Sequence, residues 1–194
     1  MASLPRNQMT FLVAGEVSVL AAPGTLVTVL GSCVAVCLWS AAMRIGGMNH
    51  YLVPRAMSGE QKYLGGDRAI PLLIEKMLSH MQSQLQGHGP SPGHGQGPHA
   101  SRSHLVRSQP GRPPSVHPRQ LIAKVFGGAH TGQHGWNGGA ENILMAWSEL
   151  RKAGIPIVAA DVGGVDSRRI SFNVATGQVQ VQRRSAPVPK EEPK

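Results

Sequence analysis

The sequence predicts a layered α/β sandwich. Short apolar runs rich in β-branched residues outnumber the two segments with helical periodicity, and hairpins that are not repeats of one another separate those segments. Apolar residues make up 41% of the chain, which is typical of globular proteins, and 194 residues suffice for one complete hydrophobic core. We therefore expect one domain over residues 1–184, followed by a flexible tail at 185–194.

Alternating apolar residues and turn signals locate the strands. Residues 11–20 form the first predicted strand, with a bend at residues 15–16. Residues 34–39 and 44–53 form a predicted hairpin, closed by a two-residue turn at 41–42. The remaining predicted strands are 121–126, a buried strand at 155–160, and a C-terminal hairpin that turns at 176–177.

Two segments carry the i, i+3, i+4, i+7 pattern of an amphipathic helix. The first predicted helix covers residues 70–85, with Asp67 available as its N-cap and Pro71 in its first turn. The second covers residues 138–153. Its expected inner face consists of Ile143, Leu144, Trp147 and Leu150. Both helices should pack against a sheet.

Between the two helices lies a segment of different composition, at about residues 86–120. It is rich in Gly, Pro, Ser, His and Arg and nearly lacks large apolar side chains, so we expect a disordered insert. Its histidines and arginines suggest metal capture or a tether to an anionic surface. The other interpretation is a tolerated surface insertion, which we favour because lengthening a loop costs little additional closure entropy.

The distribution of charges and cysteines indicates a cytoplasmic protein without a membrane segment. The net charge of +9 favours acidic partners, but part of it lies in the predicted insert. Cys33 and Cys37 lie too close in sequence to staple distant parts of the fold, which suits a reducing compartment. Residues 17–43 are uncharged and long enough to span a bilayer, yet turn signals at 23–24 and 31–32 interrupt them and favour strands.

A cysteine and a histidine on the predicted 34–53 hairpin form a candidate catalytic pair. If the turn is at residues 41–42, partners across the hairpin have numbers that sum to 83, which places Cys33 opposite His50. Opposed side chains have Cβ atoms about 5 Å apart, and a slip of two positions still leaves them within reach. A thiolate is the nucleophilic form of cysteine, and an adjacent imidazole can take the thiol proton. The alternative is that both residues are ordinary core residues.

Several motifs resemble the chemoreceptor glutamine deamidases of the CheD family. They are GSCVAVCLW, GGMNHYLVP, AKVFGGA, GIPIVAADVGG and RRISFNVATGQVQVQRR, and the resemblance covers most of residues 12–84 and 120–184. It implies an α/β/β three-layer sandwich. This sequence departs from the family pattern at the insert and at Glu141, where the family has arginine.

The resemblance also implies the roles of the candidate site residues. Cys33 corresponds to the nucleophile and His50 to its base. The third catalytic residue of the family is a threonine shortly before the cysteine; Val27 stands at the expected position, so we assign Thr28, with Thr25 as the alternative.

The implied reaction is hydrolysis of protein glutamine side chains to glutamate and ammonia through a thioester. Backbone N–H groups near Gly31 and Ser32 would hold the oxyanion. No metal or organic cofactor is expected, and we interpret His130 and His134 as parts of a glycine-rich loop that is structural or lies at the rim of the substrate site, and not as metal ligands. The implied partners are the cytoplasmic regions of methyl-accepting chemotaxis receptors and a phosphatase of the same pathway.

Two other functions remain open at this level. The first is a non-catalytic chemotaxis adaptor that binds a receptor or the phosphatase. The second is a metal-binding or nucleic-acid-binding protein, which depends on the basic, histidine-rich insert alone; we expect no nucleic-acid partner.

Overall fold

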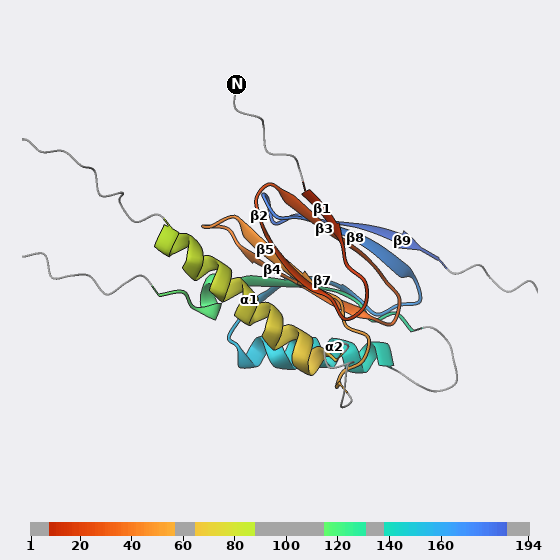
Figure 1. Ribbon diagram of the computed structural model, residues 1–194. Helices are drawn as coiled ribbons and strands as arrows, with labels where there is room; N and C mark the ends of the chain where they lie inside the picture. The colour runs from red at the N-terminus through yellow and green to blue at the C-terminus, as the bar shows by residue number, and fades with distance from the viewer. Residues whose placement is uncertain (1–7, 57–64, 88–114, 131–137, 186–194) are drawn as a thin grey trace, which may run out of the picture.

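The computed structural model describes residues 8–56, 65–87, 115–130 and 138–185. In these ranges the chain forms three layers: a pair of helices, a five-stranded sheet and a four-stranded sheet (Figure 1). The predicted α/β/β sandwich is confirmed.

The five-stranded sheet, here the middle sheet, has the strand order β2-β5-β4-β6-β7. Its strands are β2 (Val17–Ala21), β4 (Val34–Ser40), β5 (Ile45–Asn49), β6 (Ile122–Gly127) and β7 (Ile157–Val162). The four-stranded sheet, here the outer sheet, has the order β1-β3-β8-β9. Its strands are β1 (Gln8–Phe11), β3 (Gly24–Leu30), β8 (Ser167–Asn173) and β9 (Val179–Arg184).

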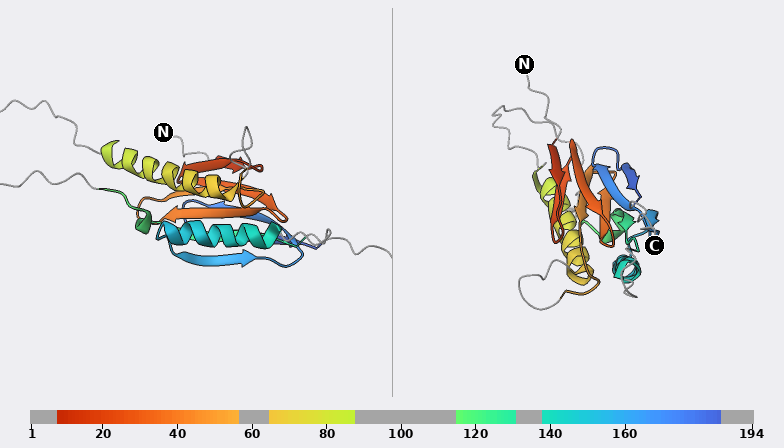
Figure 2. Two further views of the ribbon diagram at one scale, coloured as in Figure 1. Left: turned by 90° about the horizontal axis from the view of Figure 1, so that it is seen from below. Right: turned by 90° about the vertical axis from the view of Figure 1, so that its right-hand side faces the viewer.

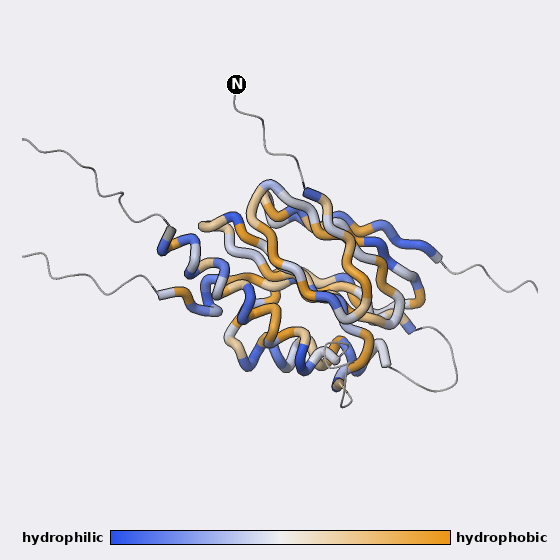
Figure 3. The backbone as a smooth tube through the Cα atoms, in the orientation of Figure 1, coloured by the Kyte–Doolittle hydropathy of each residue, from blue (hydrophilic) through white to orange (hydrophobic). Residues whose placement is uncertain are grey.

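Helices α1 (Gly66–Gly87) and α2 (Gly138–Lys152) both cover one face of the middle sheet (Figure 2). Alternate residues of β4 divide between two cores: Val34, Val36 and Leu38 face the helices, whereas Ala35 and Cys37 face the outer sheet. Apolar and polar residues both occur along the strands and helices of all three layers (Figure 3). The middle sheet is thus apolar on both faces, as expected for a central layer.

The first predicted strand, residues 11–20, is wrong as a single element. The structure divides it into β1 of the outer sheet and β2 of the middle sheet. The break lies at the predicted bend, where Leu12 N–H still bonds to Val27 O, but Gly15 N–H bonds to His50 O. Gly15 has a φ of 91°, which favours glycine. The bend therefore carries the chain from one sheet to the other.

The predicted register of the hairpin is also wrong. Pairs such as Cys37–Met48 and Ser40–Ile45 have numbers that sum to 85 instead of 83. The turn contains four residues, 41–44, because Arg44 adopts a left-handed conformation with a φ of 51°. A shift of two keeps every side chain on its predicted face, so Cys33 and His50 share a face although they are not directly opposed.

Both helices differ in detail from their predictions. The first helix begins at Gly66, so Asp67 lies inside it, where its Oδ1 accepts a hydrogen bond from Ala56 N–H (2.9 Å), and Pro71 lies beyond the first turn. On α2, the predicted inner residues Leu144 and Trp147 are 67% and 36% exposed. The buried side chains of this helix are Asn142, Ala146 and Leu150, with Ile143 partly buried.

The predicted buried strand at 155–160 is an edge strand. β7 pairs only with β6 in the described sheet, and its Val158 is 53% exposed. Between β7 and α2 lies an open groove of about 810 Å³, which includes Leu144 and Trp147 and none of the predicted site residues. The predicted inner face of α2 and the predicted buried strand are thus both wrong at the same place, the β7 edge of the middle sheet.

The uncharged stretch 17–43 contains β2, β3 and β4, which confirms the prediction of strands there. Among the described residues, no helix is both long and apolar enough to cross a bilayer. Of the predicted insert, residues 86–87 end α1 and residues 118–120 form a short 3₁₀ turn, whereas 88–114 lie outside the described residues, as does most of the predicted tail.

Candidate active site

Two of the predicted site residues meet between the sheets. Thr28 lies on β3 of the outer sheet and His50 directly follows β5 of the middle sheet; both are buried. Thr28 Oγ1 and His50 Nδ1 are 2.9 Å apart. Thr25 lies on the opposite face of β3, because the two threonines are an odd number of residues apart. Thr28 is therefore the threonine that the fold brings to His50.

The hydrogen bonds of Thr28 determine which ring nitrogen of His50 carries the proton. The Thr28 hydroxyl donates to the carbonyl oxygen of Leu12 (2.7 Å). A hydroxyl has one hydrogen, so Thr28 accepts the bond from His50, and Nδ1 is protonated. Nε2 then carries the lone pair of the neutral ring. Among the described residues this buried Nε2 has no hydrogen-bond partner.

Backbone hydrogen bonds fix the main chain at His50. His50 N–H donates to Glu16 O (3.0 Å), and His50 O accepts from Gly15 N–H (2.7 Å). Burial lowers the pKa of His50, while the carbonyl of Leu12 and the charge of Glu16 oppose that shift. The net direction is downward, so the ring is neutral at neutral pH and its Nε2 can accept a proton.

The turn that carries the nucleophile candidate is fixed through three successive carbonyl oxygens. Gly31 O accepts from Ala129 N–H (2.8 Å) and Cys33 O accepts from Gly128 N–H (2.7 Å). Between them, Ser32 O accepts from Asn142 Nδ2 (3.0 Å). The loop after β6 and the first turns of α2 thus hold residues 31–33 by their carbonyl oxygens.

Two N–H groups of this turn lie beside the sulfur of Cys33. Burial raises the pKa of the half-buried thiol, and hydrogen bonds from the amides of Cys33 and Gly31 partly offset that increase. The net direction is upward, so at neutral pH Cys33 is a thiol and needs a base to become a nucleophile. Ser32 was predicted to help hold the oxyanion. In the structure its carbonyl accepts a hydrogen bond from Asn142, and the N–H groups beside the sulfur belong to Gly31 and Cys33.

Cys33 and His50 lie on the same face of the β4–β5 hairpin without a hydrogen bond between them. Cys33 packs against the core between the sheets, which also contains Ala35 and Met48. By the observed register His50 is level with Ala35, two residues from Cys33. This diagonal arrangement is the two-position slip that the sequence analysis allowed for.

The glycine-rich loop after β6 has a packing role. Gly127 has a φ of 105°, and a Cβ atom there would collide with the carbonyl oxygen of Cys33. Its own carbonyl accepts from Gly163 N–H (2.9 Å), and His130 N–H donates to Gly164 O (2.7 Å). Glycine at 127 is therefore needed for the loop to approach the Cys33 turn.

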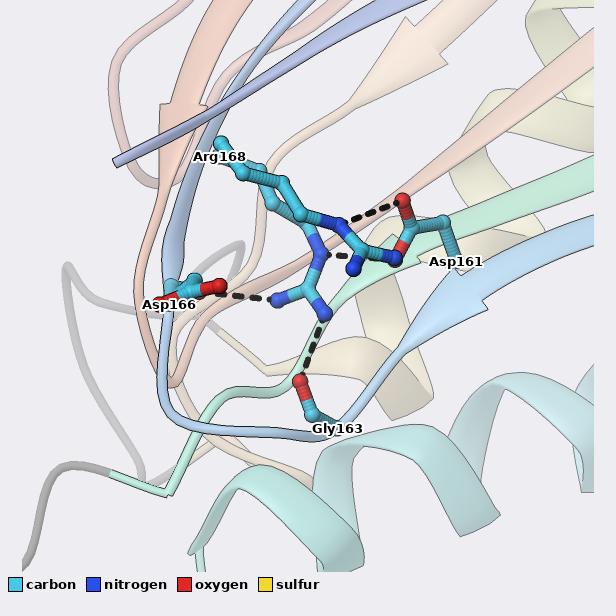
Figure 4. Close-up of polar contacts among 5 residues, drawn as sticks. Asp161, Gly163, Asp166 and Arg168 are labelled. Carbon is cyan, nitrogen blue, oxygen red and sulfur yellow. Dashed lines mark hydrogen bonds and ion pairs between the residues drawn. The ribbon is translucent and has the colours of Figure 1, made fainter. Parts of the chain in front are cut away.

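An ion-pair cluster holds the loop after β7, which in turn bonds to the glycine-rich loop (Figure 4). Arg168 is 3% exposed and donates to Asp161 Oδ1 (2.9 Å) and to the carbonyl of Gly163 (2.6 Å). Arg183 also bonds to Asp161 Oδ1 (2.9 Å). Burial acts to raise the pKa of Asp161, but the hydrogen bonds and charges of the two arginines outweigh it, so the pKa lies below its ordinary value.

We expect Asp161→Asn to destabilise the fold by about 3 kcal/mol at neutral pH, because it leaves the buried Arg168 guanidinium without its counter-charge. A depressed carboxyl pKa stabilises the fold above the unfolded pKa of about 3.9, and that stabilisation disappears as the pH falls through the folded pKa. Urea unfolding from neutral pH to below pH 4 checks this. The difference between wild type and variant should shrink on acidification, and a difference independent of pH would contradict the assignment.

Metal binding finds no geometric support in the part of the chain that the structure describes. No group of three or more His, Cys, Asp or Glu side chains gathers there. His130 is exposed, and His134 lies outside the described residues.

Sequence reasoning missed the contribution of Asn142 to this site. Its amide contacts the Cys33 turn, and its position is in line with Ala146 and Leu150 on the buried face of α2. A polar residue on an otherwise apolar helix face was the available signal, because a buried amide requires partners.

Comparisons with known proteins identify the family of this chain. The family model described as CheD chemotactic sensory transduction matches residues 114–183. The chain is 35% identical over 176 residues to the probable chemoreceptor glutamine deamidase CheD 1 of Anaeromyxobacter dehalogenans, covering 89% of this chain and 83% of that protein. It is 33% identical over 179 residues to the probable chemoreceptor glutamine deamidase CheD of Sulfurimonas denitrificans, covering 89% and 92%. The chain therefore belongs to the CheD family.

Proposed function

We propose that this chain is a chemoreceptor glutamine deamidase, which hydrolyses glutamine side chains of methyl-accepting chemotaxis receptors to glutamate and ammonia. The observation that carries the proposal is the hydrogen bond from His50 Nδ1 to Thr28, because it leaves Nε2 as an unpartnered base on the hairpin face that holds Cys33. The names of the relatives support the same reaction.

Acylation begins with proton transfer from the Cys33 thiol to His50 Nε2. The sulfur attacks the carboxamide carbon of the substrate, and the carbonyl oxygen becomes an oxyanion near the amides of Gly31 and Cys33. His50 then returns the proton to the substrate nitrogen, the carbon–nitrogen bond breaks, and ammonia leaves. The product of this half-reaction is a thioester between Cys33 and the substrate.

Deacylation uses the same groups in reverse. His50 Nε2 takes a proton from water, and the resulting hydroxide attacks the thioester carbon. The carbon–sulfur bond breaks, the proton returns to sulfur, and the substrate leaves as glutamate. Thr28 keeps the ring in the tautomer that both half-reactions require, with Leu12 O fixing the direction of the hydroxyl.

The family resemblance supports a further proposal about substrate region, compartment and partner. We place the reaction in the cytoplasm, on the cytoplasmic region of the receptors, and take a phosphatase of the chemotaxis pathway as a further partner. No metal or organic cofactor takes part in either half-reaction.

The test is to incubate the full chain with the cytoplasmic fragment of a chemoreceptor from the same organism. We expect ammonia release and conversion of particular glutamines to glutamate, with one ammonia for each glutamate found by peptide mass spectrometry. A sample whose thiols were first alkylated is the control. Receptor binding without conversion would favour the non-catalytic adaptor instead.

A further inference from the structure

We propose that Asn142 is a positioning residue that holds the nucleophile turn and the base segment in register. Its Nδ2 donates both of its hydrogens to backbone carbonyls, one to Ser32 O (3.0 Å) and one to Leu52 O (2.9 Å). Ser32 directly precedes Cys33, and Leu52 is two residues after His50. One amide group on α2 thus joins the two segments that carry the reacting side chains. This inference depends on the proposed function.

The contacts specify an amide at position 142. Both neighbours are carbonyl oxygens, so only a group with two hydrogens can satisfy them together, and this fixes the orientation of the amide. Aspartate has the same shape and would place an acceptor against two acceptors. A leucine of similar volume would leave both carbonyls unsatisfied.

Asn142 also accepts a hydrogen bond from the hairpin through its backbone carbonyl. The hydroxyl of Tyr51, the residue after His50, donates to the backbone carbonyl of Asn142 (2.6 Å). Tyr51 in turn exchanges two backbone hydrogen bonds with Val34, the residue after Cys33 (3.0 and 3.1 Å). The same helical residue is therefore bound to both sides of the hairpin at the level of the site.

The remaining polar atom of the amide lacks a partner in the described part of the chain. Asn142 is fully buried, yet its Oδ1 has no hydrogen-bond partner among the described residues. An unsatisfied buried oxygen destabilises a fold. The contribution of this side chain therefore lies in the two donated bonds, which join the turn before Cys33 to the segment after His50.

The role in catalysis follows from the lack of a direct bond between the reacting groups. Cys33 and His50 are related diagonally, so their separation depends on how the Cys33 turn and the segment after β5 are held. A misplacement of about 1 Å can reduce turnover on the order of 100-fold. The carbonyl bond to Asn142 also orients residues 31–33, whose amides lie beside the sulfur.

The test compares Asn142→Asp and Asn142→Ala with a control, Leu150→Ala, which truncates a buried side chain on the same helix away from the site. All are assayed for kcat and KM at a temperature where circular dichroism shows each to be folded. We expect about a 100-fold lower kcat for Asn142→Asp, with KM within about twofold of wild type. If the Asp variant does not fold, the Ala variant, whose cavity admits water to the two carbonyls, takes its place.

A second readout needs no receptor and separates this inference from the proposed function. The rate of Cys33 alkylation by iodoacetamide is measured against pH for wild type and for Asn142→Ala, which introduces no charge. We expect the midpoint to move to higher pH in the variant, because the amides of residues 31 and 33 are no longer fixed beside the sulfur. A kcat loss no larger than that of Leu150→Ala, or an unchanged alkylation profile, would overturn the inference.

Discussion

Replacing Cys33 by alanine should remove deamidation, lowering kcat by at least about 10⁴-fold, because the other described thiol, Cys37, is buried in the core and out of reach of a substrate. The fold should survive, since Cys33 is only half-buried and lies in a turn held by its carbonyl oxygens. The measurement is ammonia release from a receptor fragment, with receptor binding followed in parallel. Retained binding with lost ammonia release is the expected result.

The matched control is Cys37→Ala, four residues along the same chain segment. Cys37 is 1% exposed in the core between the sheets, and burial raises its pKa strongly. We expect this variant to lose about 1 kcal/mol of stability and to keep its kcat. Faster alkylation of Cys37 than of Cys33 in the folded protein, or loss of deamidation in the folded Cys37 variant, would reverse the assignment.

Replacing His50 by glutamine should lower kcat by a factor of about 10² to 10⁴, the usual contribution of a general base. The wild-type activity should also fall as the pH drops through the folded pKa of His50, because only the neutral ring accepts the thiol proton. Burial places that pKa below the ordinary value of 6.5, so activity should persist at mildly acidic pH. A pH profile of kcat/KM measures the pH at which activity falls on the acidic side.

His130→Gln is the control for this substitution. His130 is exposed, and its recorded hydrogen bond uses the backbone N–H, which glutamine retains. Its activity and pH profile should match those of the wild type. A His50→Gln variant that is folded and loses less than about tenfold in kcat would remove His50 from the proton transfer.

A layered α/β sandwich could be predicted because apolar periodicity shows which face of an element is buried, whereas the three-layer α/β/β order came from the family resemblance. The crossing between the sheets at residues 12–16 could not be predicted, because its cause is the distant partners Val27 and His50. Leu144 and Trp147 were misplaced for a related reason. An apolar side chain can be buried, but Leu144 and Trp147 lie beside the edge strand β7, where no further strand of the described sheet covers them.

The sequence predicted which face of the hairpin carries the candidate site residues, but it did not predict which residues lie directly opposite each other. Parity placed Cys33 and His50 on one side of the hairpin, and an error of two in register left that result unchanged. The register itself depends on the left-handed Arg44, which short-range sequence signals do not mark. Asn142 contributes from a helix more than 90 residues beyond His50, so no hairpin pattern could include it.

Thr28 and His50 come from different sheets, so the oriented base exists only when the two sheets are packed together. A partly folded chain could form each sheet and keep most backbone hydrogen bonds while the ring remained free to turn. Such a chain would contain every catalytic side chain and still lack the base. We therefore expect deamidase activity to require the packed sheets, so that a form which keeps its strands but loses the packing between the sheets should be inactive.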